Sequence, residues 1–200
     1  GDEFMAARSW QDTIRLKTYP LGPEDPNPPF QRQGGSWAIY PYTMQDDLLE
    51  GPPEERDYVA LHLENEYLHC IVLPELGGRV HSLRDKVTGR EVFYRNHVVK
   101  YGLVALRGAW ISGGIEFNFP TGHTYTTVSP VSWEVGRGGD EEDLENKELD
   151  DDLEPGWAWI AVGNICRLSR MEWWVRLSLG PRQRVLRQDV WLENRMSYKQ

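Results

Sequence analysis

A chain of 200 residues, of which 40% are hydrophobic, is long enough for one globular domain with its own core. No apolar run approaches the roughly 18 residues of a membrane-spanning helix, and no basic cluster could neutralise a nucleic-acid backbone. We therefore expect neither a membrane nor a nucleic acid as partner. The net charge of −9 lies in one segment, because residues 140–154 hold ten acidic residues against Lys147 alone. We interpret residues 137–155 as a solvated acidic loop.

The start of the chain and its cysteines bear on the compartment. We interpret residues 1–5 as an expression scar followed by a start methionine, and no signal segment comes after them. Cys70 and Cys166 lie in apolar stretches without a metal-ligand partner at short spacing. We interpret them as buried free thiols, which favours a reducing compartment and a cytoplasmic protein. We expect no cofactor and no metal.

Residues 6–57 are rich in proline, which excludes a long helix and disfavours central strands. We predict a wrapping arm here, with short extended pieces at 13–19 and 37–42. The prolines are Pro20, Pro23, Pro26, Pro28, Pro29, Pro41, Pro52 and Pro53.

From Tyr58 onward the sequence follows the period of two that is typical of strands. The clearest case is 171–179, where Met171, Trp173, Val175, Leu177 and Leu179 share one face. Between turns rich in glycine and proline we predict further strands at 59–63, 67–73, 79–85, 91–94, 115–119, 124–128, 131–135, 157–166 and 185–194. No sustained helical pattern is present, so we predict an all-β, antiparallel β-sandwich over residues 58–200.

The densest group of polar residues runs from Arg107 to His123 and contains four glycines, which let a ligand approach the backbone. If residues 115–119 form a strand, Glu116 and Asn118 share a face opposite Phe117. By the same alternation, Arg79 and His81 share a face opposite Val80.

These residue types are typical of a sugar site. Sugar hydroxyls need polar partners, and the apolar face of a pyranose needs a flat ring such as that of Trp110. The candidate substrate-binding residues are Arg79, His81, Arg107, Trp110, Glu116, Asn118 and His123, and Glu116 is the candidate acid or base.

Structural readings of the same residues stay open. Glu116 could be a paired structural carboxylate, His81 a satisfied strand histidine, and His123 a turn residue. A metal site from Glu116, Asn118 and His123 is disfavoured because the ligand set is mixed. Glycoside hydrolysis needs a second carboxylate, which the sequence does not identify.

Two stretches, Leu63 to Asn96 and Leu106 to Pro120, resemble an uncharacterised bacterial domain family that commonly precedes tetratricopeptide repeats. That family is similar to galactose mutarotases and related sugar-processing supersandwiches. The resemblance implies a mutarotase-like sandwich with a carbohydrate ligand, with Arg79 and Glu116 in the sugar-facing region. The Asn-His motif of active aldose epimerases is absent, and the chain stops before the strand that would supply their catalytic base. We therefore interpret the chain as the N-terminal portion of a longer protein.

Three hypotheses follow for function. The first is a carbohydrate-binding domain that is part of a larger carbohydrate-active protein. The second is an aldose epimerase or glycoside-active enzyme that uses Glu116, although we expect no activity from this chain alone. The third is a protein-interaction module that packs on downstream repeats. Because a partial sandwich leaves open sheet edges, a homodimer is a further expectation.

Overall fold

The structure is a computed structural model that describes residues 5–27, 41–43, 48–103, 109–119, 127–139 and 152–197. Within these residues the fold is all-β, with one short 3-10 turn, η1 (Pro74–Leu76). The strands are β1 (Arg8–Thr18), β2 (Glu54–Glu64), β3 (Leu68–Leu73), β4 (Arg79–Asp85), β5 (Val98–Val99), β6 (Tyr101–Leu103), β7 (Ala109–Ile111), β8 (Ser132–Arg137), β9 (Ala158–Ile165), β10 (Met171–Leu179) and β11 (Arg187–Asn194).

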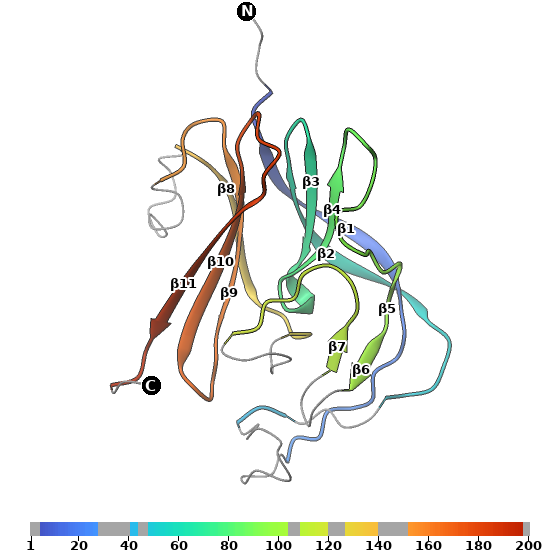
Figure 1. Cartoon of the computed structure of the whole chain (residues 1–200). Coiled ribbons are helices and arrows are strands. Elements are labelled where there is room, and N and C mark those ends of the chain that lie inside the picture. The colour runs from blue at the N-terminus through green and yellow to red at the C-terminus, as the bar shows by residue number, and fades with distance from the viewer. Residues whose placement is uncertain are drawn as a thin grey trace, which may run out of the picture.

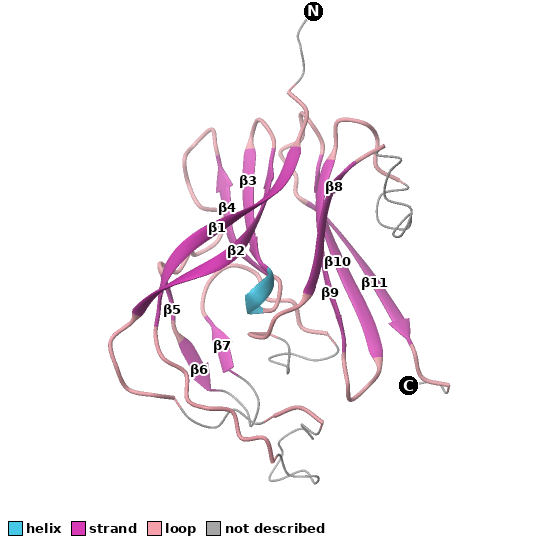
Figure 2. Ribbon diagram, turned by 180° about the vertical axis from the view of Figure 1, so that it is seen from behind, coloured by secondary structure: helices cyan, strands magenta, loops and turns pink. Residues whose placement is uncertain are grey.

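The strands form two facing sheets and a small hairpin (Figures 1 and 2). The first sheet has the order β4-β3-β2-β1-β5, the second has the order β11-β10-β9-β8, and β6 pairs with β7. All pairs are antiparallel except β1 with β5. The predicted antiparallel β-sandwich is confirmed.

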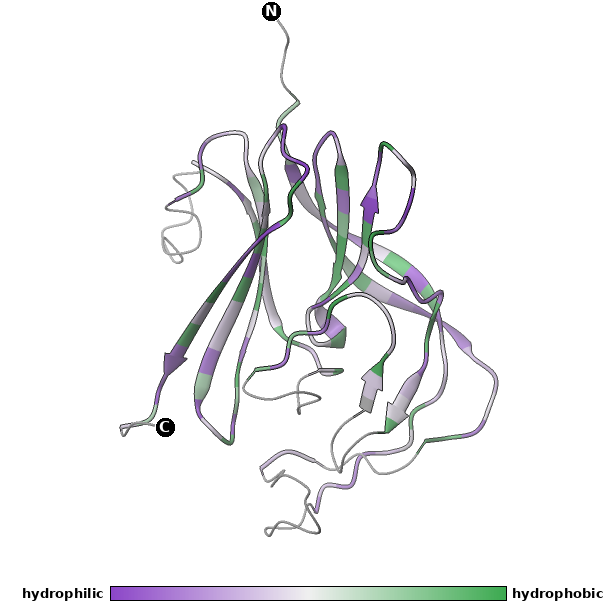
Figure 3. Ribbon diagram, in the orientation of Figure 1, coloured by the Kyte–Doolittle hydropathy of each residue, from purple (hydrophilic) through white to green (hydrophobic). Residues whose placement is uncertain are grey.

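Alternation along the strands decides which side chains are buried between the sheets. In β10, Trp173, Val175 and Leu177 point into this space and are at most 1% exposed, as predicted. Figure 3 shows the matching hydrophobic bands on β2 and β3. A second apolar cluster lies on the other side of the first sheet and joins it to the β6–β7 hairpin through Tyr58 and Ile111.

The N-terminal region does not stay outside the sandwich. β1 pairs with β2 over its full length, from Arg8 opposite Glu64 to Thr18 opposite Glu54. The first proline of the region is Pro20, so nothing interrupts the ladder before it. The strand thus begins earlier than the extended piece predicted at 13–19, and the predicted boundary at residue 57 falls inside β2.

Two predicted strands are wrong. Residues 91–94 make one isolated bridge, between Glu91 and Arg84, and residues 115–119 make one bridge, between Ile115 and Val80. The second segment still alternates, because Phe117 is buried in the core between the sheets while Glu116 is only half buried. Side-chain alternation was therefore preserved without a hydrogen-bonded ladder.

Several predicted features lie wholly or mainly outside the described residues. They are the piece at 37–42, the strand at 124–128 and the acidic loop at 137–155. Both cysteines are buried free thiols, and burial raises the pKa of Cys70 to about 12. None of the described segments forms a helix long and apolar enough to cross a membrane.

Candidate functional site

Arg79 opens β4, at the edge of the first sheet, and is only 3% exposed. Its Nη2 donates to the carbonyl oxygen of Ile111 at 2.9 Å and to that of Gly113. The guanidinium thereby ties the end of β7 and the following glycine turn to β4. Its Nη1 is buried and has no hydrogen-bond partner among the described residues.

A β-bulge interrupts β4 two residues after Arg79. Val80 and Ser82 lie opposite consecutive residues of β3, which leaves His81 as the extra residue. A bulge re-aims a side chain and breaks strict alternation. The prediction that Arg79 and His81 share a face assumed a regular strand, and β4 is not regular at this point. Alternation in the sequence does not reveal a bulge, so the prediction could not include it.

His81 is 9% exposed, and its Nε2 is buried without a hydrogen-bond partner in the described parts of the chain. Burial lowers the pKa of His81 to about 4, and the positive charges of Arg95 and Arg79 lower it further. The imidazole is therefore neutral at pH 7. The carboxylate of Glu91 opposes this shift, so these groups lie within electrostatic range of one another.

Glu116 lies on the glycine turn that packs against β4. Burial lowers the pKa of Arg79, and the negative charge of Glu116 partly offsets that effect. The turn is tightly fixed: a Cβ on Gly114, whose φ is +67°, would lie 1.8 Å from the carbonyl oxygen of Val80. Arg79, His81 and Glu116 therefore form one polar cluster at the edge of the first sheet.

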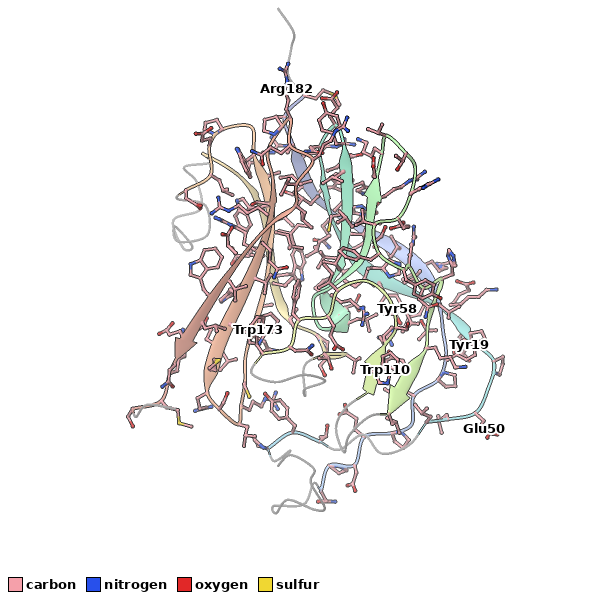
Figure 4. The ribbon with its side chains drawn as sticks, viewed as in Figure 1. Tyr19, Glu50, Tyr58, Trp110, Trp173 and Arg182 are labelled. Carbon is pink, nitrogen blue, oxygen red and sulfur yellow. The ribbon has the colours of Figure 1, made fainter. Side chains whose placement is uncertain are left out.

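Trp110 belongs to β7 but does not face this cluster. Residue 111 packs on the first sheet, so Trp110 points to the other side of the hairpin. There its ring lies over Gly102, where an added Cβ would lie 2.6 Å from the indole nitrogen, and 38% of the residue is exposed. Figure 4 shows Trp110 on the hairpin, far from Trp173 of the opposite sheet.

A cavity of about 570 Å³ lies at the end of β1 and the start of β2. Tyr19, Tyr101 and Glu50 contribute to its lining, and Figure 4 shows Tyr19 and Glu50 near this edge of the molecule. Another cavity, of about 450 Å³, is lined by residues 6–8, 137–139 and 155–157. Neither lining includes Arg79, His81 or Glu116.

Of the three other predicted site residues, the structure describes only one. Asn118 is half buried, one residue after Phe117, whereas Arg107 and His123 lie outside the described residues. In the described part of the chain, no three His, Cys, Asp or Glu side chains gather where they could hold a metal ion.

Sequence reasoning missed the segment after β4. Glu91 accepts hydrogen bonds from the hydroxyl of Ser82 at 2.8 and 2.9 Å and forms an ion pair with Arg95 at 3.3 Å. Ser82 follows His81 in the bulge, and the charges of Glu91 and Arg95 act on the His81 imidazole. Glu91 was assigned to a predicted strand at 91–94 and Arg95 follows directly after it, so the sequence analysis placed neither residue in the cluster.

Comparison with known proteins agrees with this picture of the fold. The chain is similar to the crystal structure of a TPR-domain containing protein from Parabacteroides distasonis, with 28% sequence identity and a TM-score of 0.75. The match covers 94% of this chain and 29% of that protein, so the chain spans less than a third of that protein's length. Residues 36–200 match the model of a domain of unknown function, DUF5107. The chain therefore belongs to the DUF5107 family.

Proposed function

We propose that this domain binds carbohydrate through the polar cluster of Arg79, His81 and Glu116. The observation that carries the proposal is the pair of buried nitrogens, Arg79 Nη1 and His81 Nε2, which have no hydrogen-bond partner among the described residues. Buried polar atoms without partners are costly and usually mark a bound water or ligand. Since the charge of Arg79 acts on His81, the two side chains lie within electrostatic range, and we include in the proposal that one bound group satisfies both nitrogens.

A hydroxyl group fits these two atoms better than an ion does. The guanidinium can only donate, whereas a neutral imidazole nitrogen donates or accepts according to its tautomer. A hydroxyl does both, and the carboxylate of Glu116 can accept from a neighbouring hydroxyl. Because the two nitrogens are buried, the hydroxyl of a ligand, or a water held beneath it, would reach them rather than bulk solvent.

Two other features support a sugar as ligand. Trp110 presents an exposed ring on the outer side of the hairpin, which suits a further sugar unit of an oligosaccharide. The resemblance to galactose mutarotase-like domains favours the same ligand class. We include in the proposal that the domain is part of a larger carbohydrate-active protein in a reducing, cytoplasmic compartment, which the two free thiols support.

Titration calorimetry against a panel of mono- and oligosaccharides tests the proposal. We expect Glu116→Gln to weaken binding at least about tenfold, equivalent to about 1.4 kcal/mol. Glu134→Gln is the matched control, because Glu134 is also half buried but lies on β8 of the second sheet. Binding that Glu116→Gln leaves unchanged, or no binding to any sugar of the panel, would contradict the proposal.

Binding does not require turnover, and we propose that this chain alone is not an epimerase. Proton NMR of freshly dissolved α-glucose or α-galactose separates the two functions. We expect the rate of anomer exchange to be the same with and without the protein. Accelerated exchange that Glu116→Gln abolishes would instead favour the enzymatic alternative.

A second candidate function is packing against helical repeats, favoured by the similar structure, which belongs to a TPR-domain containing protein. In that case the polar cluster would be structural. Co-purification with the repeat segment of a parent protein, unaffected by Glu116→Gln and by added sugar, would support this alternative.

A further inference from the structure

Residues 91–97 lie against the glycine turn of the polar cluster. The backbone nitrogen of Gly114 donates to the carbonyl oxygen of Tyr94 at 2.9 Å. A Cβ on Gly113 would lie 2.9 Å from that same oxygen, so the two backbones touch at this point. Both contacts fix the residue directly before Arg95. Arg95 is therefore held beside the cluster by backbone packing and not by its side chain alone.

The charge of Arg95 acts on this cluster. Burial contributes most to the lowered pKa of His81, and the positive charge of Arg95 contributes next, ahead of that of Arg79. Two guanidinium groups thus act on one buried imidazole. They differ in their access to solvent, because 36% of the Arg95 side chain is exposed, whereas Arg79 as a whole is only 3% exposed. A ligand that arrives from solvent can therefore reach Arg95 more readily than Arg79.

One edge of the Arg95 guanidinium lacks a partner. Its Nη1 donates to Glu91 at 3.3 Å, which is longer than the about 2.7–2.9 Å of a strong charge-assisted hydrogen bond. Both oxygens of Glu91 lie closer to the hydroxyl of Ser82, at 2.8 and 2.9 Å. Among the described residues, no hydrogen bond involves Nε or Nη2 of Arg95, and Nε is buried. The N–H bonds of these two nitrogens are parallel, which is the geometry that a carboxylate matches with two hydrogen bonds.

We propose that the sugar bound at this site is an acidic one, whose carboxylate pairs with the Nε and Nη2 edge of Arg95 while a hydroxyl occupies Arg79 and His81. The inference rests on the proposed function, because it adds a second recognised group to the same ligand. A guanidinium can only donate hydrogen bonds, so its unpaired edge needs a group with two acceptor oxygens. A hydroxyl has one oxygen, whereas the carboxylate of a uronic acid has two and carries the opposite charge.

The charges around the cluster favour a carboxylate over a phosphate. Arg79 and Arg95 supply two positive charges. Glu91 and Glu116 supply two negative charges, and the His81 imidazole is neutral at pH 7. A phosphate carries a charge of about −1.5 to −2 and would be repelled more strongly by the two glutamates than a uronate, which carries one charge. At the partly exposed Arg95 the carboxylate also keeps some of its hydration, which limits the cost of burying it.

Titration calorimetry with matched ligands tests the inference. The panel contains glucose, glucuronate, glucuronamide and glucose 6-phosphate, together with the four corresponding compounds of galactose. In at least one of the two series we expect the uronate to bind at least about tenfold more tightly than the neutral sugar. It should exceed the uronamide by a similar factor, because the amide has the same size but no charge and only one acceptor oxygen. This comparison needs no variant, so it does not depend on whether a substituted chain folds.

Arg95→Gln tests the residue, and Arg90→Gln is its matched control. Each variant removes one positive charge, and Arg90 is exposed and lies directly before Glu91. We expect Arg95→Gln to reduce the preference for the uronate over the neutral sugar to about twofold or less, because the two parallel hydrogen bonds are lost. Arg90→Gln should retain the preference, because an exposed charge is screened by solvent. Circular dichroism of both variants checks that the sheets are intact.

The possible results separate this inference from the proposed function. If the uronate and the neutral sugar bind equally well, the inference is wrong and the proposed function stands. If the 6-phosphate binds more tightly than the uronate, the choice of a carboxylate is wrong. A preference for the uronate that Arg95→Gln leaves unchanged would overturn the role of Arg95. If no sugar of the panel binds, the proposed function is contradicted, and this inference with it.

Discussion

Each of the two sheets buries one arginine, and the two guanidinium groups have different partners. Arg176 of β10 is fully buried, yet it forms ion pairs with Asp152 at 2.7 Å and with Asp189 at 2.8 Å. Its guanidinium carbon also lies 5.1 Å from the ring centre of Trp191. Arg79 of β4 has two backbone carbonyls and, among the described residues, no ion pair.

This difference separates a structural charge from a candidate binding group. A buried ion is tolerated when carboxylates and hydrogen bonds balance it, and Arg176 meets that condition within the chain. Burial lowers the pKa of Arg79, which indicates that Glu116 balances its charge only partly. Under the proposed function, a ligand uses the hydrogen-bonding capacity that remains at Arg79 Nη1.

Replacing Arg176 should have the largest effect on stability. We expect Arg176→Met to lower the free energy of unfolding by about 4 kcal/mol, because Asp152 and Asp189 would then share, among the described residues, the cation of Arg187 alone. Urea denaturation measures this change. Arg187→Met removes a partly exposed cation from the same network and should lower the free energy of unfolding by about 1 kcal/mol or less. If the two variants lost equal stability, the burial of Arg176 would not explain its contribution.

The histidine of the bulge should make stability depend on pH. The pKa of His81 is about 4 in the folded chain against 6.5 when unfolded, so the unfolded state binds more protons between these values. Stability is therefore complete above pH 6.5 and is lost as the pH falls toward 4, by about 3 kcal/mol.

Comparison with His81→Gln isolates this contribution. Burial also lowers the pKa of His62 and of His69, and these two residues contribute a slope of the same sign in both proteins. Urea denaturation at several pH values should show a shallower slope for His81→Gln. Identical slopes would contradict the buried, neutral imidazole.

Arg79→Met should destabilise the chain less than Arg176→Met does. The variant loses two charge-assisted hydrogen bonds but also relieves the burial of an incompletely balanced charge, so we expect a cost of about 2 kcal/mol. Sugar binding should be lost in the folded variant, as judged by calorimetry below its unfolding transition. A cost equal to that of Arg176→Met, with binding retained, would remove the distinction between the two arginines.

The smallest effect should come from Asp152. Hydrogen bonding to Arg176 lowers the pKa of Asp152 from 3.8 to about 2. A depressed pKa stabilises the fold above pH 3.8, and this contribution is lost as the pH falls toward 2. Because Asp152 is half exposed, solvent screens much of it. Asp152→Asn should flatten the pH dependence of stability in this window only, while an unchanged profile would contradict the ion pair.

Alternation predicted the buried faces well but not what covers the opposite faces. It placed Trp173, Val175 and Leu177 on the core side of β10. It could not show that Arg176, on the other side, is as buried as they are. Asp152, which pairs with it, lies 24 residues earlier in the chain, and Trp191 comes from the neighbouring strand β11, so the period of two within β10 carries no signal of this packing.

For the polar cluster, the residue types could be predicted but their geometry could not. Arg79 and Glu116 stood out because charged residues flank glycine turns there. The bulge at His81 and the single bridge of residues 115–119 lie where β4 packs against the glycine turn, a contact between segments that are more than 30 residues apart in sequence. In particular, the positive φ of Gly114 allows the turn to approach the backbone of β4, which period-two reasoning does not include.

The most direct test of the account follows the His81 imidazole itself. In a protein labelled with ¹⁵N-histidine, the Nε2 resonance of His81, assigned by its loss in His81→Gln, is recorded while the best-binding saccharide is added. We expect this resonance to shift and to saturate at the same sugar concentration as the calorimetric titration. A saccharide that binds while the Nε2 resonance stays unchanged would contradict the claim that Arg79 and His81 receive a ligand hydroxyl.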